Sequence, residues 1–158
     1  METSRLRRTG RVTASIVLRV VVPLTMGAGV YLLRSQPTVA DGWANAVGMH
    51  DAVTRLRSLA LVGAEERAPR WLLGTLPDAL WAFVVAQSIL LIWSHGSRAA
   101  RLFWSSLGLC LVLGWELGQA LHVVRGTFDV RDLLASAAAY ALALIATPSS
   151  TLRIKESV

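Results

Sequence analysis

Apolar residues along this chain gather into four long runs that are separated by shorter polar joints. The runs cover residues 12–33, 77–93, 102–124 and 133–147. A helix needs about 17–25 mostly apolar residues to cross a bilayer, and each run approaches that length, the second and fourth only marginally. The pattern predicts an all-α polytopic membrane protein in which four transmembrane helices pack as a bundle, with a long first extracytoplasmic loop.

Composition agrees with a membrane protein. The 158 residues are 54% hydrophobic and have a mean hydropathy of +0.51, a share that a soluble domain with a wet surface rarely carries. The formal net charge is +6, but the basic residues are scattered and form no stripe with exposed aromatics, so nucleic acid is not an expected partner. Cys110 is the single cysteine of the sequence, which leaves no cysteine pair for a disulfide or a zinc site. No cofactor is expected.

The charge pattern predicts how the chain is laid across the membrane. Arg5, Arg7, Arg8 and Arg11 precede the first run, and the positive-inside rule keeps this end in the cytoplasm. Four crossings return the C-terminal tail to the same side. The predicted segments are a basic cytoplasmic N-terminus (1–11), a first transmembrane helix (12–34), an extracytoplasmic loop (35–76), a three-helix core (77–148) and a cytoplasmic tail (149–158).

The first run has an alternative interpretation as a cleaved signal peptide, with residues 38–40 as the cleavage site. Its length and the presence of Arg19 and Pro23 favour a retained anchor. In the loop that follows, an irregular apolar stripe predicts an amphipathic helix on the outer membrane surface. The stripe consists of Trp43, Val47, Leu56, Leu59 and Ala60.

The start of the second run has the features of a helix N-terminus. Thr75 is the expected N-cap, Pro77 lies in the expected first turn and Asp78 stands near the N3 position. Capping is therefore one interpretation of Asp78. Counting inward from Pro77 brings Gln87 and Ser88 to the depth expected for Glu116.

Glu116 is the residue with the clearest functional signal, because it lies inside the third apolar run. A carboxyl group at that depth costs several kcal/mol, so an intramembrane acid indicates a functional site by default. Gln119, three residues further on, shares its helix face. The alternative is a neutral Glu116 that is only hydrogen-bonded to Gln119, Ser136 or a backbone carbonyl.

Acidic residues also open the fourth run. Capping is favoured for Asp129, whereas capping and a role in a site are equally weighted for Asp132. If the chain turns near Gly126, Glu116 and Ser136 each lie about 15 Å from the turn. We therefore expect a polar pocket that opens outward, with Glu116 at its floor. The expected mouth consists of Asp78, Asp129, Asp132, Arg125 and Arg131.

Two further patterns concern helix packing. Gly114 and Gly118 form a G-x-x-x-G step, and the small residues 135–139 of the fourth run are its expected partner. Trp81 and Trp115 are interpreted as core residues, with a lipid-lining role as the alternative. The acids and His122 have no spacing diagnostic of a metal site, so none is predicted.

A short motif ties these residues to a known family. It consists of a Glu-x-x-Gln pair late in one crossing, a short turn and an Asp that opens the last crossing, here Glu116, Gln119, Arg125, Gly126 and Asp132. With this motif, residues 76–147 resemble the VanZ-like family of small bacterial integral membrane proteins. The family's Asn and Gly after the Asp are Ser136 and Ala139 here, and its earlier Asp-x-x-His has Trp81 in place of His.

The resemblance implies an envelope-associated protein of the bacterial cytoplasmic membrane and no particular reaction. The favoured hypothesis is an accessory or binding protein whose acidic pocket takes a membrane lipid or a lipid-linked envelope component. The alternatives are an intramembrane enzyme with Glu116 as general acid or base, assisted by Gln119 or Asp132, and a subunit of a larger membrane complex. The candidate binding residues are Asp78, Glu116, Gln119, Arg125, Asp129, Asp132 and Ser136.

Overall fold

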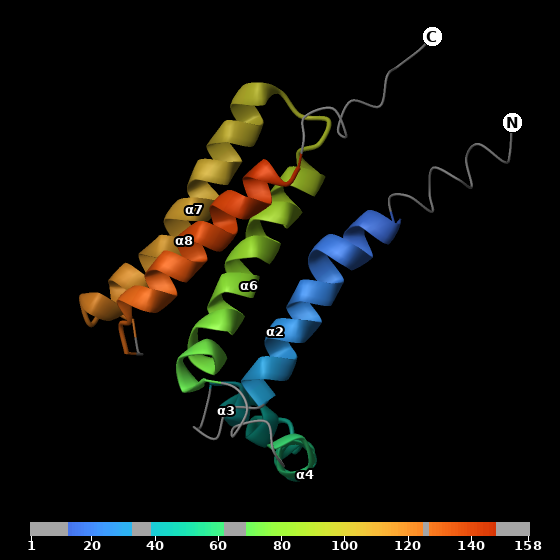
Figure 1. Ribbon diagram of the computed structural model, residues 1–158, viewed down its shortest axis with the longest axis vertical. Helices are drawn as coiled ribbons and strands as arrows, with labels where there is room; N and C mark the ends of the chain where they lie inside the picture. The colour runs from blue at the N-terminus through green and yellow to red at the C-terminus, as the bar shows by residue number, and fades with distance from the viewer. Residues whose placement is uncertain (1–12, 33–38, 62–68, 125–126, 148–158) are drawn as a thin grey trace, which may run out of the picture.

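The computed structural model describes residues 13–32, 39–61, 69–124 and 127–147, and its regular elements in these ranges are all helices (Figure 1). The prediction of an all-α chain is therefore confirmed for the described part. The elements are η1 (Val17–Val21), α2 (Val22–Leu32), α3 (Val39–Ala46), α4 (His50–Leu61), α6 (Arg70–Ile92), α7 (Arg98–Ala120) and α8 (Val130–Ile145).

Three stretches of helix are long and apolar enough to cross a membrane, as a multi-pass membrane protein requires. They are Thr13–Val30, Trp71–Ile92 and Arg98–Ala120. The fourth apolar run forms α8, which has 16 residues and a length of about 24 Å at 1.5 Å per residue. Sixteen residues fall below the roughly 17–25 that a crossing helix needs, whereas the other three stretches have 18, 22 and 23 residues.

Most large apolar side chains lie on the outside of the bundle, and apart from Tyr140 the residues of the buried core are small. The buried core consists of Ala82, Ala86, Tyr140 and Ala143. Trp81 and Trp115, which we expected to pack in the core, are 58% and 59% exposed. Lipid tails are as apolar as a core, so no force drives a large apolar side chain inward, whereas small residues let helices approach closely.

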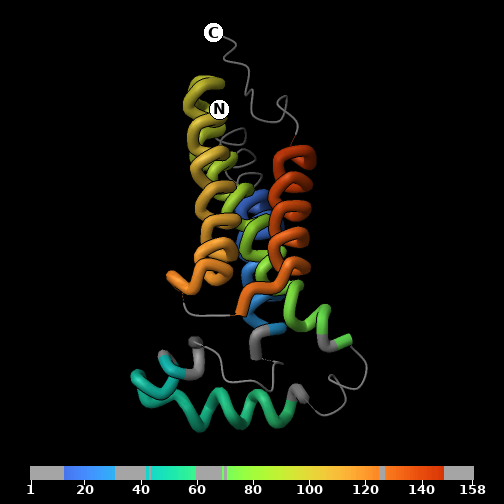
Figure 2. The backbone as a smooth tube through the Cα atoms, turned by 90° about the vertical axis from the view of Figure 1, so that its left-hand side faces the viewer, coloured from blue at the N-terminus to red at the C-terminus, as the bar shows by residue number. Residues whose placement is uncertain are grey.

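Helix α6 is central, since it packs against α2, α7 and α8, and most extensively against α8 (Figure 1). The start of α6, the end of α7 and the start of α8 lie at one end of the bundle. Helices α3 and α4 lie across that same end (Figure 2). Helices thus form in the segment predicted to hold a surface helix, whose position on a membrane stays a prediction; the side chains of Trp43 and Ala60 lie outside the described part.

The predicted start of α6 is wrong. The helix begins at Arg70 and continues through Pro77, so Thr75 is not its N-cap and Asp78 lies more than two turns inside it. A proline removes one backbone hydrogen bond of a helix. Ending the helix there would free several polar backbone groups in an apolar environment, which costs more than one missing bond.

The earlier start of α6 also shifts its register. Gln87 does not lie near Glu116. Its Nε2 donates to the backbone oxygen of Ala143 (2.8 Å) and to Oγ1 of Thr147 (3.0 Å), near the far end of α8. The prediction counted the depth of Gln87 from Pro77, whereas the helix begins seven residues earlier at Arg70, so the expected depth of Gln87 was displaced by about 10 Å. Helices α6 and α8 run in the same direction, and this hydrogen bond joins residues that are 56 positions apart in sequence.

Helix α7 meets α8 through Gly108 rather than through the predicted Gly114–Gly118 step. A Cβ atom at Gly108 would lie 2.6 Å from Oη of Tyr140, whereas nothing lies within 4 Å of one at Gly114. Tyr140 also donates from Oη to the backbone oxygen of Ser105, at 2.6 Å. Gly118 instead faces Val124, because the chain folds back over the end of α7 and the amide of Val124 donates to the Gly118 oxygen.

Candidate functional site

Three acidic residues, one from each of α6, α7 and α8, form the polar centre at the end of the bundle where α6 begins. They are Asp78, Glu116 and Asp132. The Glu116 side chain is 6% exposed, and its Oε2 atom is buried without a hydrogen-bond partner. Asp78, Asp132 and Asp129 are the acidic residues whose negative charges act on this buried carboxylate. A buried, unsatisfied carboxylate oxygen among like charges costs several kcal/mol and needs a positive partner or a proton.

Hydroxyl groups accompany the carboxylates at helical spacing. Thr75 precedes Asp78 by three residues on α6, and Ser136 follows Asp132 by four residues on α8, so each pair shares one face of its helix. Thr75 is 8% exposed and Ser136 is 2% exposed. Each of these two helices therefore carries an acid and a buried hydroxyl on one face.

Exposure falls from the end of the bundle toward Glu116. Asp129 and Arg131 are exposed, Asp78 and Asp132 are half-buried, and Glu116 is buried. We call the three carboxylates of Asp78, Glu116 and Asp132 the acidic funnel. The pocket with Glu116 at its floor stays a prediction, since Glu116 does not line the groove described below.

Capping separates the two aspartates of α8. Asp129 is the N-cap, and its Oδ1 accepts a hydrogen bond from the backbone amide of Arg131 at 2.8 Å, which confirms the capping interpretation. Asp132 lies in the first turn, and its Oδ1 is buried without a hydrogen-bond partner. Capping therefore accounts for Asp129 and leaves the Asp132 carboxylate available to the acidic funnel.

Gln119 is engaged away from the carboxylates. In the amide orientation that satisfies both neighbours, its nitrogen donates to the Thr127 backbone oxygen (3.0 Å) and its oxygen accepts from Nε1 of Trp115 (3.1 Å). Gln119 therefore fastens the end of α7 to the segment that leads into α8. His122 is exposed and has a φ of 58°, in the turn that ends α7. Arg125, a predicted rim residue, lies outside the described residues.

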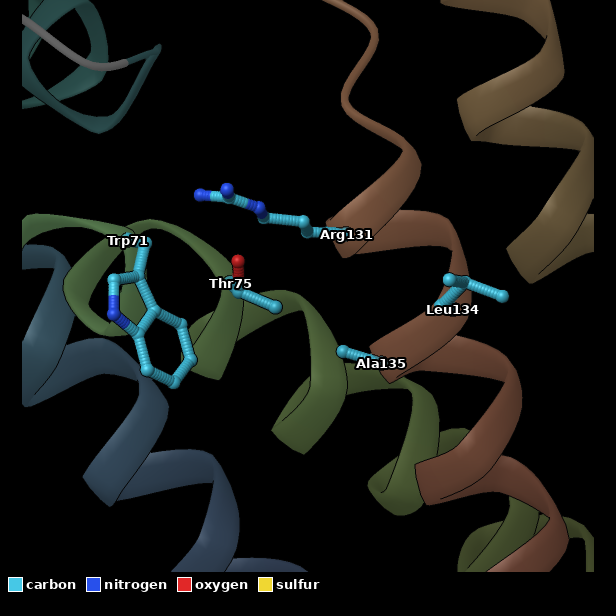
Figure 3. Close-up of a pocket in the computed structure, with 5 residues that line it drawn as sticks. All are labelled: Trp71, Thr75, Arg131, Leu134 and Ala135. Atoms are coloured by element: carbon cyan, nitrogen blue, oxygen red, sulfur yellow. The ribbon is translucent and has the colours of Figure 1, made fainter.

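A groove lies beside the acidic funnel, between the first turns of α6 and α8. It is open, has a volume of about 450 Å³ and is lined by Trp71, Thr75, Arg131, Leu134 and Ala135. Figure 3 shows the Arg131 side chain reaching from α8 over α6, with its guanidinium above the Thr75 hydroxyl. Thr75 thus lines the groove and also shares a helix face with Asp78, three residues further along α6.

Sequence reasoning missed the parts of the site that depend on where α6 begins. Thr75 was interpreted as a cap, and Trp71 falls within the segment predicted to be loop; both line the groove. The three-residue spacing of Thr75 and Asp78 was the available signal, since it places a hydroxyl and an acid on one helix face.

The acidic residues are spread more widely than the ligands of one metal ion. In the described part of the chain, no three His, Cys, Asp or Glu side chains are grouped closely enough to hold such an ion. Comparisons with protein-family models, with curated proteins and with solved structures find no match to this chain.

Proposed function

We propose that this chain is a VanZ-like accessory protein of the bacterial cytoplasmic membrane, whose acidic funnel binds the amine-bearing head group of an envelope lipid or lipid-linked component. In this proposal α8 and its flanking residues form a fourth crossing, and both termini lie in the cytoplasm. The funnel then opens on the outer face of the membrane, where such components are assembled.

The observation that carries the proposal is the buried, unpartnered Oε2 of Glu116, on which the negative charges of Asp78 and Asp132 act. An ammonium group supplies both the positive charge and the hydrogen-bond donors that this oxygen lacks. The wide spread of the carboxylates favours a cationic group larger than a metal ion. Because exposure decreases from Asp129 to Glu116, a head group can enter from the rim with its amine foremost.

The test is Glu116→Gln, which keeps the size of the side chain and removes its charge. Protein in nanodiscs would be compared by native mass spectrometry for retention of phosphatidylethanolamine and phosphatidylglycerol. We expect the wild type to prefer the amine lipid and the variant to lose about 10- to 150-fold of that preference, since a charge-assisted hydrogen bond contributes roughly 1.5–3 kcal/mol. Asp51→Asn is the matched control, because it removes an exposed acid in α4 at the same end.

The outcomes separate the hypotheses. Equal retention of the amine lipid by the wild type and Glu116→Gln would overturn the binding proposal. If retention is unchanged while Glu116→Gln abolishes the cellular phenotype, with normal insertion and accumulation, a catalytic acid or base becomes the better interpretation of Glu116.

A further inference from the structure

Arg131 is a cationic residue to which the proposed binding of an amine by the acidic funnel gives no role. It stands in the first turn of α8, is exposed, and reaches over the groove toward α6 (Figure 3). Within the part of the chain that the structure describes, its guanidinium has no ion pair, and the hydrogen bond to Asp129 uses only its backbone amide. A guanidinium with free donors beside a hydroxyl group matches the oxygens of a phosphate group.

The rest of the groove is apolar. Trp71 and Leu134, which form two of its walls, are 55% and 63% exposed, and Ala135 contributes a small surface between the helices. These walls belong to helices whose outer faces carry exposed large apolar residues suited to lipid. A Trp near the end of an apolar helix is typical of the level of lipid head groups. The groove therefore combines a guanidinium that can bind a phosphate with apolar walls that can contact the start of an acyl chain.

We propose that this groove binds the phosphate of an anionic phospholipid, with the guanidinium of Arg131 and the hydroxyl of Thr75 on the phosphate oxygens and the acyl chain along Leu134 and Ala135. The occupant is a lipid rather than a free phosphate, because three of the five lining residues, Trp71, Leu134 and Ala135, are apolar. The inference stands apart from the proposed function, because it concerns a ligand of opposite charge held by a different charged residue.

The test measures lipid preference in nanodiscs that contain phosphatidylglycerol and phosphatidylcholine in equal amounts. We expect the wild type to retain phosphatidylglycerol about tenfold more strongly, and Arg131→Gln to abolish this preference. Arg131→Lys is expected to recover only part of it, because an ammonium lacks the two-pronged geometry of a guanidinium. Arg98→Gln, which removes an exposed arginine at the opposite end of the bundle, is the matched control.

Two further experiments test which group of the lipid is bound, one with a Thr75 variant and one with a competing free phosphate. Thr75→Val keeps the shape of the side chain and should weaken phosphatidylglycerol retention severalfold without unfolding the bundle, as far-UV circular dichroism would verify. Glycerol 3-phosphate in large excess should not displace the lipid; displacement at equal concentration would show that a free phosphate is the ligand and overturn the proposal. Equal loss of preference in Arg98→Gln and Arg131→Gln would also overturn it, since general charge rather than the groove would then attract the lipid.

The two sites can fail separately. Glu116→Gln should leave the phosphatidylglycerol preference intact, and Arg131→Gln should leave the preference for phosphatidylethanolamine over phosphatidylglycerol at least as strong as in the wild type. If Arg131→Gln loses the preference for phosphatidylglycerol and also the preference for phosphatidylethanolamine, the assignment of an independent phosphate site is overturned. Loss of the phosphatidylglycerol preference alone supports it.

Discussion

Replacing Gly108 with alanine should loosen the contact between α7 and α8, whereas the same replacement at Gly114 should not. A Cβ atom at Gly108 would lie 2.6 Å from Oη of Tyr140 and would also meet Cδ1 of Ile89. Nothing lies within 4 Å of one at Gly114, six residues along the same helix. Tyr140 has little room to move, because its side chain is 1% exposed and its Oη is hydrogen-bonded to Ser105.

The matched pair isolates the packing energy. Each replacement gains the helix propensity of alanine over glycine, up to about 1 kcal/mol, and this gain cancels when the two variants are compared. Overpacking a filled interior costs about 1–3 kcal/mol, so Gly108→Ala should have a free energy of unfolding lower than Gly114→Ala by that amount. Tyr140→Phe removes the oxygen that the new Cβ atom would crowd. In the Gly108→Ala background it should therefore restore part of the lost free energy of unfolding, so the effects of the two replacements should not add.

The assay is reversible unfolding in mixed micelles by titration with sodium dodecyl sulfate, followed by far-UV circular dichroism. Tyr140→Phe alone should cost about 0.6 kcal/mol, the average for a hydrogen bond between membrane helices. If Gly108→Ala and Gly114→Ala unfold with the same free energy within about 0.5 kcal/mol, the close approach of α7 and α8 at Gly108 is refuted.

Two other predictions concern the cap of α8 and the lipid-facing surface. Asp129→Ala removes the acceptor for the Arg131 amide and should lower the free energy of unfolding by about 1 kcal/mol. Asp129→Asn keeps an acceptor and should retain most of the wild-type free energy of unfolding, so equal losses in the two variants would contradict the capping role. Trp81 and Trp115 should be quenched by lipids brominated on their acyl chains, so Trp81→Phe and Trp115→Phe should each reduce the quenched fluorescence, and no change in either would show that the ring is shielded from lipid.

The helices followed from the sequence because apolar runs in a membrane protein must satisfy their backbone polar groups internally, which favours helix over their whole length. The same reasoning explains the main error. Pro77 was interpreted as a boundary, as it would be in water, although an uninterrupted helix costs less in an apolar environment. The register of α6 was then displaced, and Gln87 was expected at the wrong depth.

The acidic funnel was partly predictable because α7 and α8 are joined by a short connection. Counting from that turn put Glu116 further inward than Asp129 and Asp132, and in the structure Glu116 is buried, whereas Asp129 is exposed and Asp132 is half-buried. The partners of Gln119 were not predictable, since its contact with Thr127 depends on the path of the chain after α7. The Gly114–Gly118 step misled for a similar reason, because spacing does not reveal which face of α7 meets α8.

The parallel register of α6 and α8 has a consequence for how a ligand reaches the site. The Gln87–Ala143 hydrogen bond sets an offset of 56 residues, and the same offset pairs Thr75 with Arg131 across the groove. Subtracting 56 from 130 brings the first residue of α8 level with Gly74, about 6 Å below the start of α6 at Arg70. The shorter helix thus leaves a step at this end of the bundle. In the proposed phospholipid site, a lipid diffusing within its leaflet would place its head group over this step without leaving the bilayer.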